Sequence, residues 1–282
     1  MDRLTILHIS DLHIRTGEEF EYDRSAVLGT MLERIEKDRH EKGIEPELVV
    51  VTGDIAFQGM KEEYDLAEEF FTDLRKTLDL HRENVFLVPG NHDVNRKSYR
   101  PRDIPSYDTV EELNEELGDP DYREDLLKGM VGYFEFVESE YAHLSPIKDR
   151  LIPFIHRKTV QCGKTVEIIG LNSAWMCRKS PDEKTIAIGE VQAKTAFDKA
   201  EKEDRPGLRI FMLHHPQQWL WPKDRKRCRR FFNGAVVFCG HMHEPEGSNL
   251  HDQDGNYCQF QAGAAYITRK KKWPSRYQYL TV

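Results

Sequence analysis

The chain has 282 residues, of which 39% are hydrophobic and 32% are charged, and its formal net charge is −8. This size and composition predict a globular protein with one large α/β domain, alone or with a small insertion. The negative charge argues against a general nucleic-acid-binding protein, because contacts with phosphates dominate such binding. The sequence contains no stretch near the roughly 18 apolar residues that a membrane-spanning helix needs.

The five cysteines are odd in number and never occur in a C-x-x-C pair. They favour neither a disulfide framework nor a zinc ribbon, and we interpret them as reduced thiols. The first residues lack the charged start, apolar centre and cleavage site of a signal peptide. We therefore expect a cytoplasmic protein.

The amino-terminal third of the chain predicts two successive strand–helix–strand units. Apolar runs at residues 4–9, 48–52 and 85–88 predict buried strands, and apolar residues at helical spacing predict helices over 25–42 and 60–80. Such units form parallel strands joined by right-handed crossovers. The carboxyl ends of the three strands therefore meet at one edge of a sheet.

Polar residues follow each of these strands. Asp11 and His13 follow the first, Asp54 follows the second, and Asn91, His92 and Asp93 follow the third. Alternate side chains of an extended backbone share a face, so an Asp and a His two positions apart can converge on one ion. The α/β proteins bind ligands at the carboxyl ends of their strands. The pattern therefore predicts a functional site at this edge.

The next segment, residues 95–150, is rich in Asp and Glu with apolar residues between them. We expect two or more helices here, inserted within a single domain of residues 1–282 as a lid over the site. We interpret the acidic residues as a solvated face.

The second half predicts more strands that end in polar residues. We expect a hairpin from residues 152–160 and 165–171, a helix over 189–203, and strands at 208–213, 235–238, 257–264 and 277–282. His214 and His215 follow the strand at 208–213, and His241 and His243 follow the strand at 235–238. The last strand reaches the end of the sequence, which suggests the N-terminal domain of a longer protein.

Together the strand ends offer carboxylate, amide and imidazole ligands and no thiolate, a set typical of divalent manganese, iron or zinc. The candidate ligands are Asp11, His13, Asp54, Asn91, His92, His214, His241 and His243. They are too many for one ion. Two cations that share a carboxylate fit better, and such pairs catalyse in-line displacement at phosphorus.

These motifs resemble the signatures of the calcineurin-like metallophosphoesterases. They are D-x-H at 11–13, G-D at 53–54, G-N-H-D at 90–93, H-x-P at 214–216 and G-H-x-H at 240–243. They occur in the family's order and span nearly the whole chain. The resemblance implies an α/β fold of four layers, an αββα sandwich, and hydrolysis of a phosphoester by a metal-bridging hydroxide.

The resemblance also implies a role for each position. Asp11, His13 and His243 would bind one divalent cation, Asn91, His214 and His241 the other, and Asp54 would bridge the two. His92 would bind no metal and would stabilise or protonate the leaving oxygen. Asp93 and His215 would support or line the site without contacting metal. Manganese is the preferred cation, with iron, zinc or cobalt as alternatives.

The segment after Asp54 indicates which class of phosphoester is the substrate. Protein serine/threonine phosphatases carry G-D-x-x-D-R-G, whereas Phe57 and Gln58 stand here in place of the second Asp and the Arg. The sequence is more similar to the bacterial cyclic-nucleotide phosphodiesterases. We therefore expect a phosphodiester substrate, a nucleotide or a cyclic nucleotide.

Two alternatives stay open. A metal-dependent nuclease would contact DNA or RNA through two basic runs, one from Arg225 to Arg230 and one from Arg269 to Lys272. The simpler interpretation of both runs is solvated charge. A non-catalytic binding scaffold of the same fold is the other alternative, although scaffolds of this kind have lost metal ligands. The sequence does not define the oligomeric state.

Overall fold

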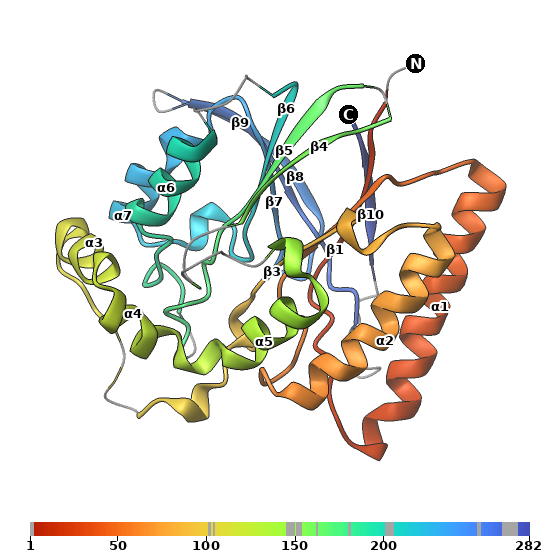
Figure 1. Ribbon diagram of the computed structural model, residues 1–282, viewed down its shortest axis with the longest axis horizontal. Helices are drawn as coiled ribbons and strands as arrows, with labels where there is room; N and C mark the ends of the chain where they lie inside the picture. The colour runs from red at the N-terminus through yellow and green to blue at the C-terminus, as the bar shows by residue number, and fades with distance from the viewer. Residues whose placement is uncertain are drawn as a thin grey trace.

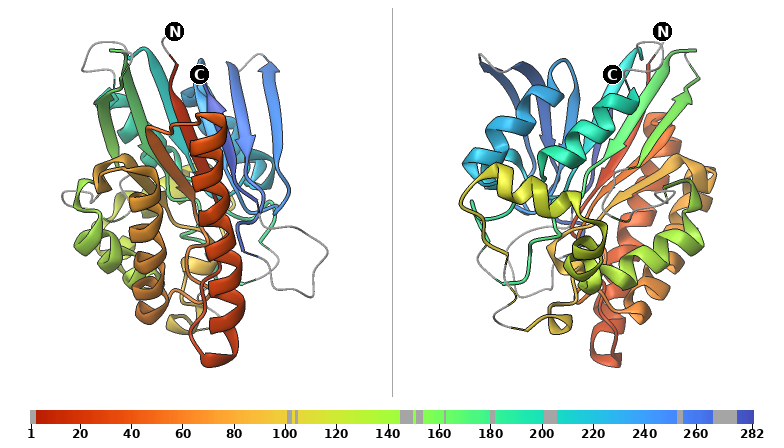
Figure 2. Two further views of the ribbon diagram at one scale, coloured as in Figure 1. Left: turned by 90° about the vertical axis from the view of Figure 1, so that its right-hand side faces the viewer. Right: turned by 60° about the vertical axis from the view of Figure 1, so that its left-hand side comes forward.

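Two β-sheets stacked on each other form the centre of the molecule, and helices cover the outer face of each (Figures 1 and 2). The computed structural model describes residues 3–100, 103, 105–144, 150, 154–161, 163–179, 182–200, 206–252, 255–266 and 276–282. The predicted αββα layering is confirmed.

The first sheet has the strand order β10–β1–β2–β3. Its strands are β1 (Thr5–Ile9), β2 (Leu48–Thr52), β3 (Val85–Val88) and β10 (Gln278–Thr281). The first three are parallel, and β10 pairs antiparallel with β1. Every residue of β2 and β3 is buried, as expected for central parallel strands covered on both faces.

The second sheet has the strand order β4–β5–β6–β7–β9–β8. Its strands are β4 (Ile155–Thr159), β5 (Thr165–Gly170), β6 (Leu208–Met212), β7 (Val236–Cys239), β8 (Glu246–Asp252) and β9 (Gly255–Gln261). The strands β5, β6, β7 and β9 are parallel, whereas β4 and β8 are antiparallel strands at the two edges. The predicted hairpin corresponds to β4 and β5.

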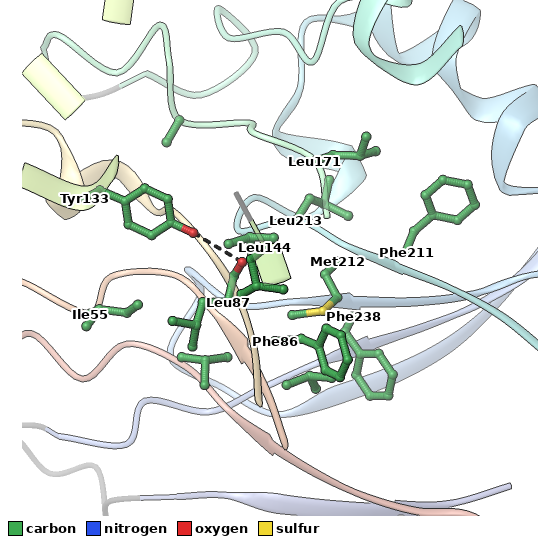
Figure 3. Packing of buried hydrophobic residues seen from close by; sticks show 14 of the residues in the cluster. Ile55, Phe86, Leu87, Tyr133, Leu144, Leu171, Phe211, Met212, Leu213 and Phe238 are labelled. Atoms are coloured by element: carbon green, nitrogen blue, oxygen red, sulfur yellow. Dashed lines mark hydrogen bonds between the residues drawn. The ribbon is translucent and has the colours of Figure 1, made fainter. Parts of the chain in front are cut away.

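The helices fall on opposite sides of the stacked sheets. The helices α1 (Glu18–Lys42) and α2 (Lys61–Leu78) pack together beside the first sheet, and α6 (Glu190–Ala200) and α7 (Pro222–Cys228) pack together beside the second (Figure 1). A buried cluster fills the space between the sheets. It includes Phe86 from β3, Met212 from β6 and Phe238 from β7 (Figure 3).

The expected helical insertion contains α3 (Val110–Gly118), α4 (Pro120–Leu127) and α5 (Val131–Glu140). The helix α3 contacts α6, and α5 contacts α2, so the segment joins the two helical layers. It also touches the loops that follow two strands. Asn95 N donates to Gly129 O at 2.7 Å, and Asn172 Nδ2 approaches Met130 Sδ at 3.4 Å.

The sequence-based prediction differs from the structure at one helix boundary and in one missing strand. The first helix begins at Glu18, not near residue 25, because its first turns are acidic and solvent-exposed and so carry no apolar periodicity. Acidic residues in a first turn favour a helix start. The strand β8 was not predicted, because a mostly polar edge strand lacks the apolar alternation that identifies strands. No helix among the described residues is long and apolar enough to cross a bilayer.

Candidate metal centre

All seven predicted metal ligands follow carboxyl ends of parallel strands and meet between the two sheets. The loop after β1 carries Asp11 and His13, the loop after β2 carries Asp54, and the loop after β3 carries Asn91. On the second sheet, His214 follows β6, and His241 and His243 follow β7. The centre therefore lies where the two sheets present the same ends of their strands.

The backbone at these positions is strained. Asp11, His13, Asp54, His241 and His243 all have φ between 45° and 74°. Residues other than glycine rarely adopt this left-handed region, and such strain concentrates at functional sites where the surrounding structure enforces it. The conformation turns each side chain back from its strand end towards the centre of the site.

Three glycines allow the loops to approach each other. A Cβ on Gly53, which has φ +89°, would lie 2.7 Å from Gly90 N and from His214 Nδ1. A Cβ on Gly90 would overlap the Asp54 carboxylate, and one on Gly240 would overlap Ser10. The glycines in the G-D, G-N-H-D and G-H-x-H motifs are thus required for close packing of the loops that carry the ligands.

One group of donor atoms consists of Asp11, His13 and His243. His243 Nε2 lies 3.3 Å from Asp11 Oδ1 and 3.4 Å from His13 Nε2, and His13 Nε2 lies 3.8 Å from Asp11 Oδ1. The Asp11 side chain is fully buried, whereas that of His243 is 35% exposed. Solvent therefore reaches this group at His243.

A second group consists of Asn91, His214 and His241. Asn91 Oδ1 lies 3.0 Å from His214 Nε2 and 2.9 Å from His241 Nδ1, and the two imidazole nitrogens are 3.2 Å apart. His214 Nδ1 donates to the Thr52 carbonyl at 2.7 Å. This bond fixes the ring and directs Nε2 into the site, as is common for histidines that bind metals.

Asp54 connects the two groups through a single oxygen. Its Oδ2 lies 3.4 Å from His214 Nε2 and 3.8 Å from His13 Nε2. Its Oδ1 accepts a hydrogen bond of 2.7 Å from the backbone N–H of His92. One carboxylate oxygen thus faces both groups while the other is held by the loop after β3.

The donor chemistry fits divalent cations. With His214 Nδ1 used as a donor, Nε2 of the neutral ring has only a lone pair, and this faces the lone pairs of Asn91 Oδ1 and Asp54 Oδ2. A cation or a proton between these atoms would relieve the repulsion. Within the described part of the chain, Asp11 Oδ1 and His13 Nδ1 are buried and have no hydrogen-bond partner. Such unsatisfied buried groups require an explanation, and a bound cation supplies one for Asp11.

The pKa values of these side chains bear on their ability to bind divalent cations. Burial alone would raise the pKa of Asp54, but His214 and His13 hold that pKa well below its usual range. Burial lowers the pKa of His13 to about 4 and that of His241 to about 4, so both rings are neutral at pH 7. Burial would also lower the pKa of His214, but the Asp54 carboxylate raises it to about 9, so without a cation this ring is protonated at pH 7 and must release a proton when a cation binds. Carboxylates and neutral imidazoles are the forms that bind metals.

His92 lies beside the ligands and is oriented by its neighbours. Its Nδ1 donates to the Phe57 carbonyl at 2.8 Å, which leaves Nε2 available. Its ring centre is 4.6 Å from that of His13, and the ring stacks on Phe57 with centres 5.1 Å apart. The structure thus places an oriented imidazole next to His13 of the first donor group and next to Asp54.

Asp93 holds together the loops that follow β2 and β3. Its carboxylate accepts from Gly90 N at 2.8 Å, Ala56 N at 2.9 Å, Ile55 N at 3.2 Å and the Tyr64 hydroxyl at 3.0 Å. Burial and the nearby Asp54 raise the pKa of Asp93 to about 6. The residue is fully buried and does not appear in either donor group.

His215 is buried behind the second donor group, and both of its ring nitrogens have neighbours. Nδ1 lies 3.0 Å from Ser173 Oγ, and Nε2 lies 3.7 Å from Cys177 Sγ. Its ring centre is 4.6 Å from that of His241. Both ring nitrogens therefore have a neighbour, although one of them lies within 4.8 Å of nitrogens of His214 and His241.

The sequence did not predict the contacts that two residues, Tyr64 and Trp219, make beside the site. Tyr64, which binds Asp93, lies at helical spacing with apolar residues and was therefore indistinguishable from the core. Trp219 packs edge-on against His241 with ring centres 4.4 Å apart, and its indole N–H donates to Asp182 Oδ1 at 3.1 Å. Neither contact has a local sequence signal, because each partner comes from a distant loop.

The first basic run lies on α7 and the turn after it. Arg227 pairs with Glu111 and Glu190, and Arg230 pairs with Glu190. The predicted solvated acidic face of α3 therefore contributes a partner to this run. The second run, from Arg269 to Lys272, lies outside the described residues.

Comparison with known proteins identifies relatives of this chain. Residues 4–245 match the family model described as calcineurin-like phosphoesterase. An uncharacterized metallophosphoesterase-like protein, YydB of Bacillus subtilis, is 26% identical over 249 residues, 86% of this chain and 49% of that protein. A probable glycerophosphodiester phosphodiesterase, GpdQ of Arcobacter nitrofigilis, is 32% identical over 111 residues, 39% of this chain and 37% of that protein. The chain spans about half the length of the Bacillus relative.

Solved structures share the fold. Purple acid phosphatase PPD1 from yellow lupin seeds superposes with a TM-score of 0.55 at 10% identity, covering 99% of this chain and 49% of that one. Phosphopantetheinyl hydrolase PptH from Mycobacterium tuberculosis has a TM-score of 0.50 at 15% identity, covering 99% and 96%. These identities establish the fold alone. The match of the family model over nearly the whole chain identifies the protein as a member of the calcineurin-like phosphoesterases.

Proposed function

We propose that the protein is a dinuclear metal-dependent phosphodiesterase. The observation that carries this proposal is the pair of donor groups joined by Asp54 Oδ2, 3.4 Å from His214 Nε2 and 3.8 Å from His13 Nε2. One group would hold a cation through Asp11, His13 and His243, and the other through Asn91, His214 and His241. Manganese is our first choice, and iron, zinc or cobalt would suit the same ligands.

When bound, the two cations would supply Lewis acidity and a hydroxide nucleophile at neutral pH. The protein's own residues would do the rest. Asp54 would hold the two cations at a fixed separation, and Asp93 would keep the loop of Asn91 and His92 against the loop of Asp54. His92 would donate a proton from Nε2 to the leaving oxygen, since its Nδ1 is committed to Phe57.

We favour a phosphodiester over a phosphoprotein because Phe57 and Gln58 stand where protein phosphatases carry Asp and Arg. The partial match to a probable glycerophosphodiester phosphodiesterase agrees with this class. A small nucleotide or cyclic nucleotide is favoured over a polymer, because Glu111 and Glu190 neutralise two cations of the first basic run.

The test is to deplete the protein of metal, restore it with manganese, iron, zinc or cobalt, and measure both metal content and hydrolysis of bis(4-nitrophenyl) phosphate and 4-nitrophenyl phosphate. We expect about two cations per chain and a higher kcat/KM for the diester. A chain that binds no metal and hydrolyses neither ester would refute the proposal. A protein that binds metal but hydrolyses only the monoester would refute the diester assignment.

Substitution of His92 separates catalysis from metal binding. We expect His92→Ala to lower kcat by about 10²–10⁴-fold, the usual contribution of a general acid, with metal content unchanged. His81→Ala, at an exposed histidine, is the matched control and should leave both unchanged. Loss of metal from His92→Ala would show that His92 is a ligand.

To test for a polymeric substrate, kcat/KM of the same protein is measured at two salt concentrations. If DNA or RNA were the substrate, kcat/KM would fall steeply with salt, because bound phosphates release counterions. Cleavage of a cyclic nucleotide should depend on salt much less. A steep salt dependence with single-stranded DNA or RNA would favour the nuclease alternative.

A further inference from the structure

Arg15 lies outside both donor groups and beside His92. The loop after β1 and the loop after β2 pair through a parallel bridge between Ile14 and Ala56, and Phe57 N donates to Ile14 O at 3.0 Å. This pairing sets Arg15 next to Phe57. The guanidinium carbon lies 3.5 Å from the centre of the Phe57 ring and 5.1 Å from that of Phe20.

Phe57 connects the guanidinium to His92. The two rings stack with centres 5.1 Å apart and an angle of 29° between their planes, and the Phe57 carbonyl accepts from His92 Nδ1. We call Arg15, Phe57 and His92 the Arg15 ladder. Because Arg15 and His92 both occupy the Phe57 ring, that ring has little surface to offer a nucleobase. The Arg15 ladder therefore offers a substrate a positive charge, but no free aromatic face on which a base could stack.

The charge of Arg15 is not paired with a carboxylate in the part of the chain that the structure describes. Its guanidinium contacts there are the two aromatic rings, and such cation–π contacts leave the N–H groups free to donate. The carbonyl of Arg15 accepts from Arg24 Nη1 at 2.8 Å, which fixes this stretch of backbone. A half-buried guanidinium held by rings is well placed to bind an anion.

A second polar group without a partner lies nearby. Among the residues that the structure describes, the buried hydroxyl of Tyr266 has no hydrogen-bond partner, and the Tyr266 N–H donates to Asp11 O at 3.3 Å.

We propose that Arg15 is a specificity residue that binds an anionic group on the departing alcohol of the substrate. The inference rests on the proposed function, in which His92 protonates the leaving oxygen. Phe57 packs against both Arg15 and His92, so a substituent on the departing alcohol that extends past Phe57 would reach Arg15. Among nucleotides and other small phosphodiesters, the preferred substrates are those whose leaving alcohol carries a carboxylate or a second phosphate. Arg15 exchanges no proton and forms no covalent bond.

The test compares two diesters that differ only in this charge, methyl 3-carboxyphenyl phosphate and methyl 3-carbamoylphenyl phosphate, together with their 4-substituted isomers. The kcat/KM of each is measured for the metal-loaded wild type, Arg15→Ala, Arg15→Lys and the control Arg34→Ala on the exposed side of α1. We expect wild type to prefer the carboxylate. Arg15→Ala should reduce this preference about ten- to a hundredfold, the range of a charge-assisted hydrogen bond. Arg15→Lys should retain part of it.

The outcomes are separable. Equal losses on both diesters in Arg15→Ala would show that Arg15 only positions His92, and would overturn the specificity role. An unchanged preference would overturn it as well. If the wild type hydrolysed neither diester, the phosphodiesterase proposal itself would fail, whereas hydrolysis of both with no preference would refute the role of Arg15 alone.

Discussion

Asp93→Asn tests whether one buried carboxylate holds the metal-binding loops together. The carboxylate accepts four hydrogen bonds, three from backbone N–H groups of the loops after β2 and β3 and one from Tyr64. Asparagine keeps one acceptor oxygen and replaces the other with an N–H₂ donor. The Tyr64 hydroxyl can turn to accept from this donor, but a backbone N–H on the same side cannot.

At least one buried N–H therefore loses its acceptor, at a cost of about 1–3 kcal/mol, and the remaining bonds lose their charge assistance. We expect a decrease in the free energy of unfolding of about 2–4 kcal/mol. Tyr64→Phe removes one donor and leaves three, so it should cost about 1 kcal/mol. Asp73→Asn on the exposed face of α2 is the matched control and should stay within about 0.5 kcal/mol of wild type.

The assay is urea unfolding of the metal-free protein, followed by kcat with bis(4-nitrophenyl) phosphate after metal is restored. Because Gly90 N is one of the donors, Asp93→Asn should also displace Asn91 and His92 and lower kcat. A variant as stable as wild type would show that the four hydrogen bonds do not control the loop. Loss of stability with unchanged kcat would show that the loop position is set by other contacts.

Three further predictions follow from the geometry. Asp54→Asn should lower the affinity for both cations, measured by metal content after dialysis, because one oxygen faces both donor groups; loss of only one cation would contradict its bridging position. Gly90→Ala should lower kcat about 100-fold, because a Cβ would displace the Asp54 carboxylate, whereas Gly118→Ala, with open space around it, should have no effect. Burial lowers the pKa of His8 to about 3, so the unfolded chain binds more protons between pH 3 and 6.5, and stability falls as pH falls through this window. Between pH 7 and pH 5, the free energy of unfolding of His8→Gln should therefore fall by about 2 kcal/mol less than that of wild type, measured by denaturant unfolding at each pH. Identical pH dependences of the two proteins would refute this prediction.

The parallel strands and the residues that follow them were predictable because both are local properties of the chain. Buried parallel strands are continuous apolar runs, and the polar residues at their ends stand out against them, so Asp11, Asp54 and Asn91 could be assigned to one edge. The helical insertion was predictable for the same reason. The start of α1 and the edge strand β8 were not, because their side chains are polar and exposed and carry no periodic signal.

Only the tertiary structure shows which contacts these residues make. The left-handed backbone at five of the predicted ligands, the Asp54 oxygen that faces both donor groups and the four donors around Asp93 depend on segments far apart in the sequence. The same holds for Arg15, which nothing in its neighbourhood of the sequence distinguishes from other surface arginines. The local sequence determines which residues follow the end of each strand. Only the packing of one loop against another determines which atoms each of these side chains contacts.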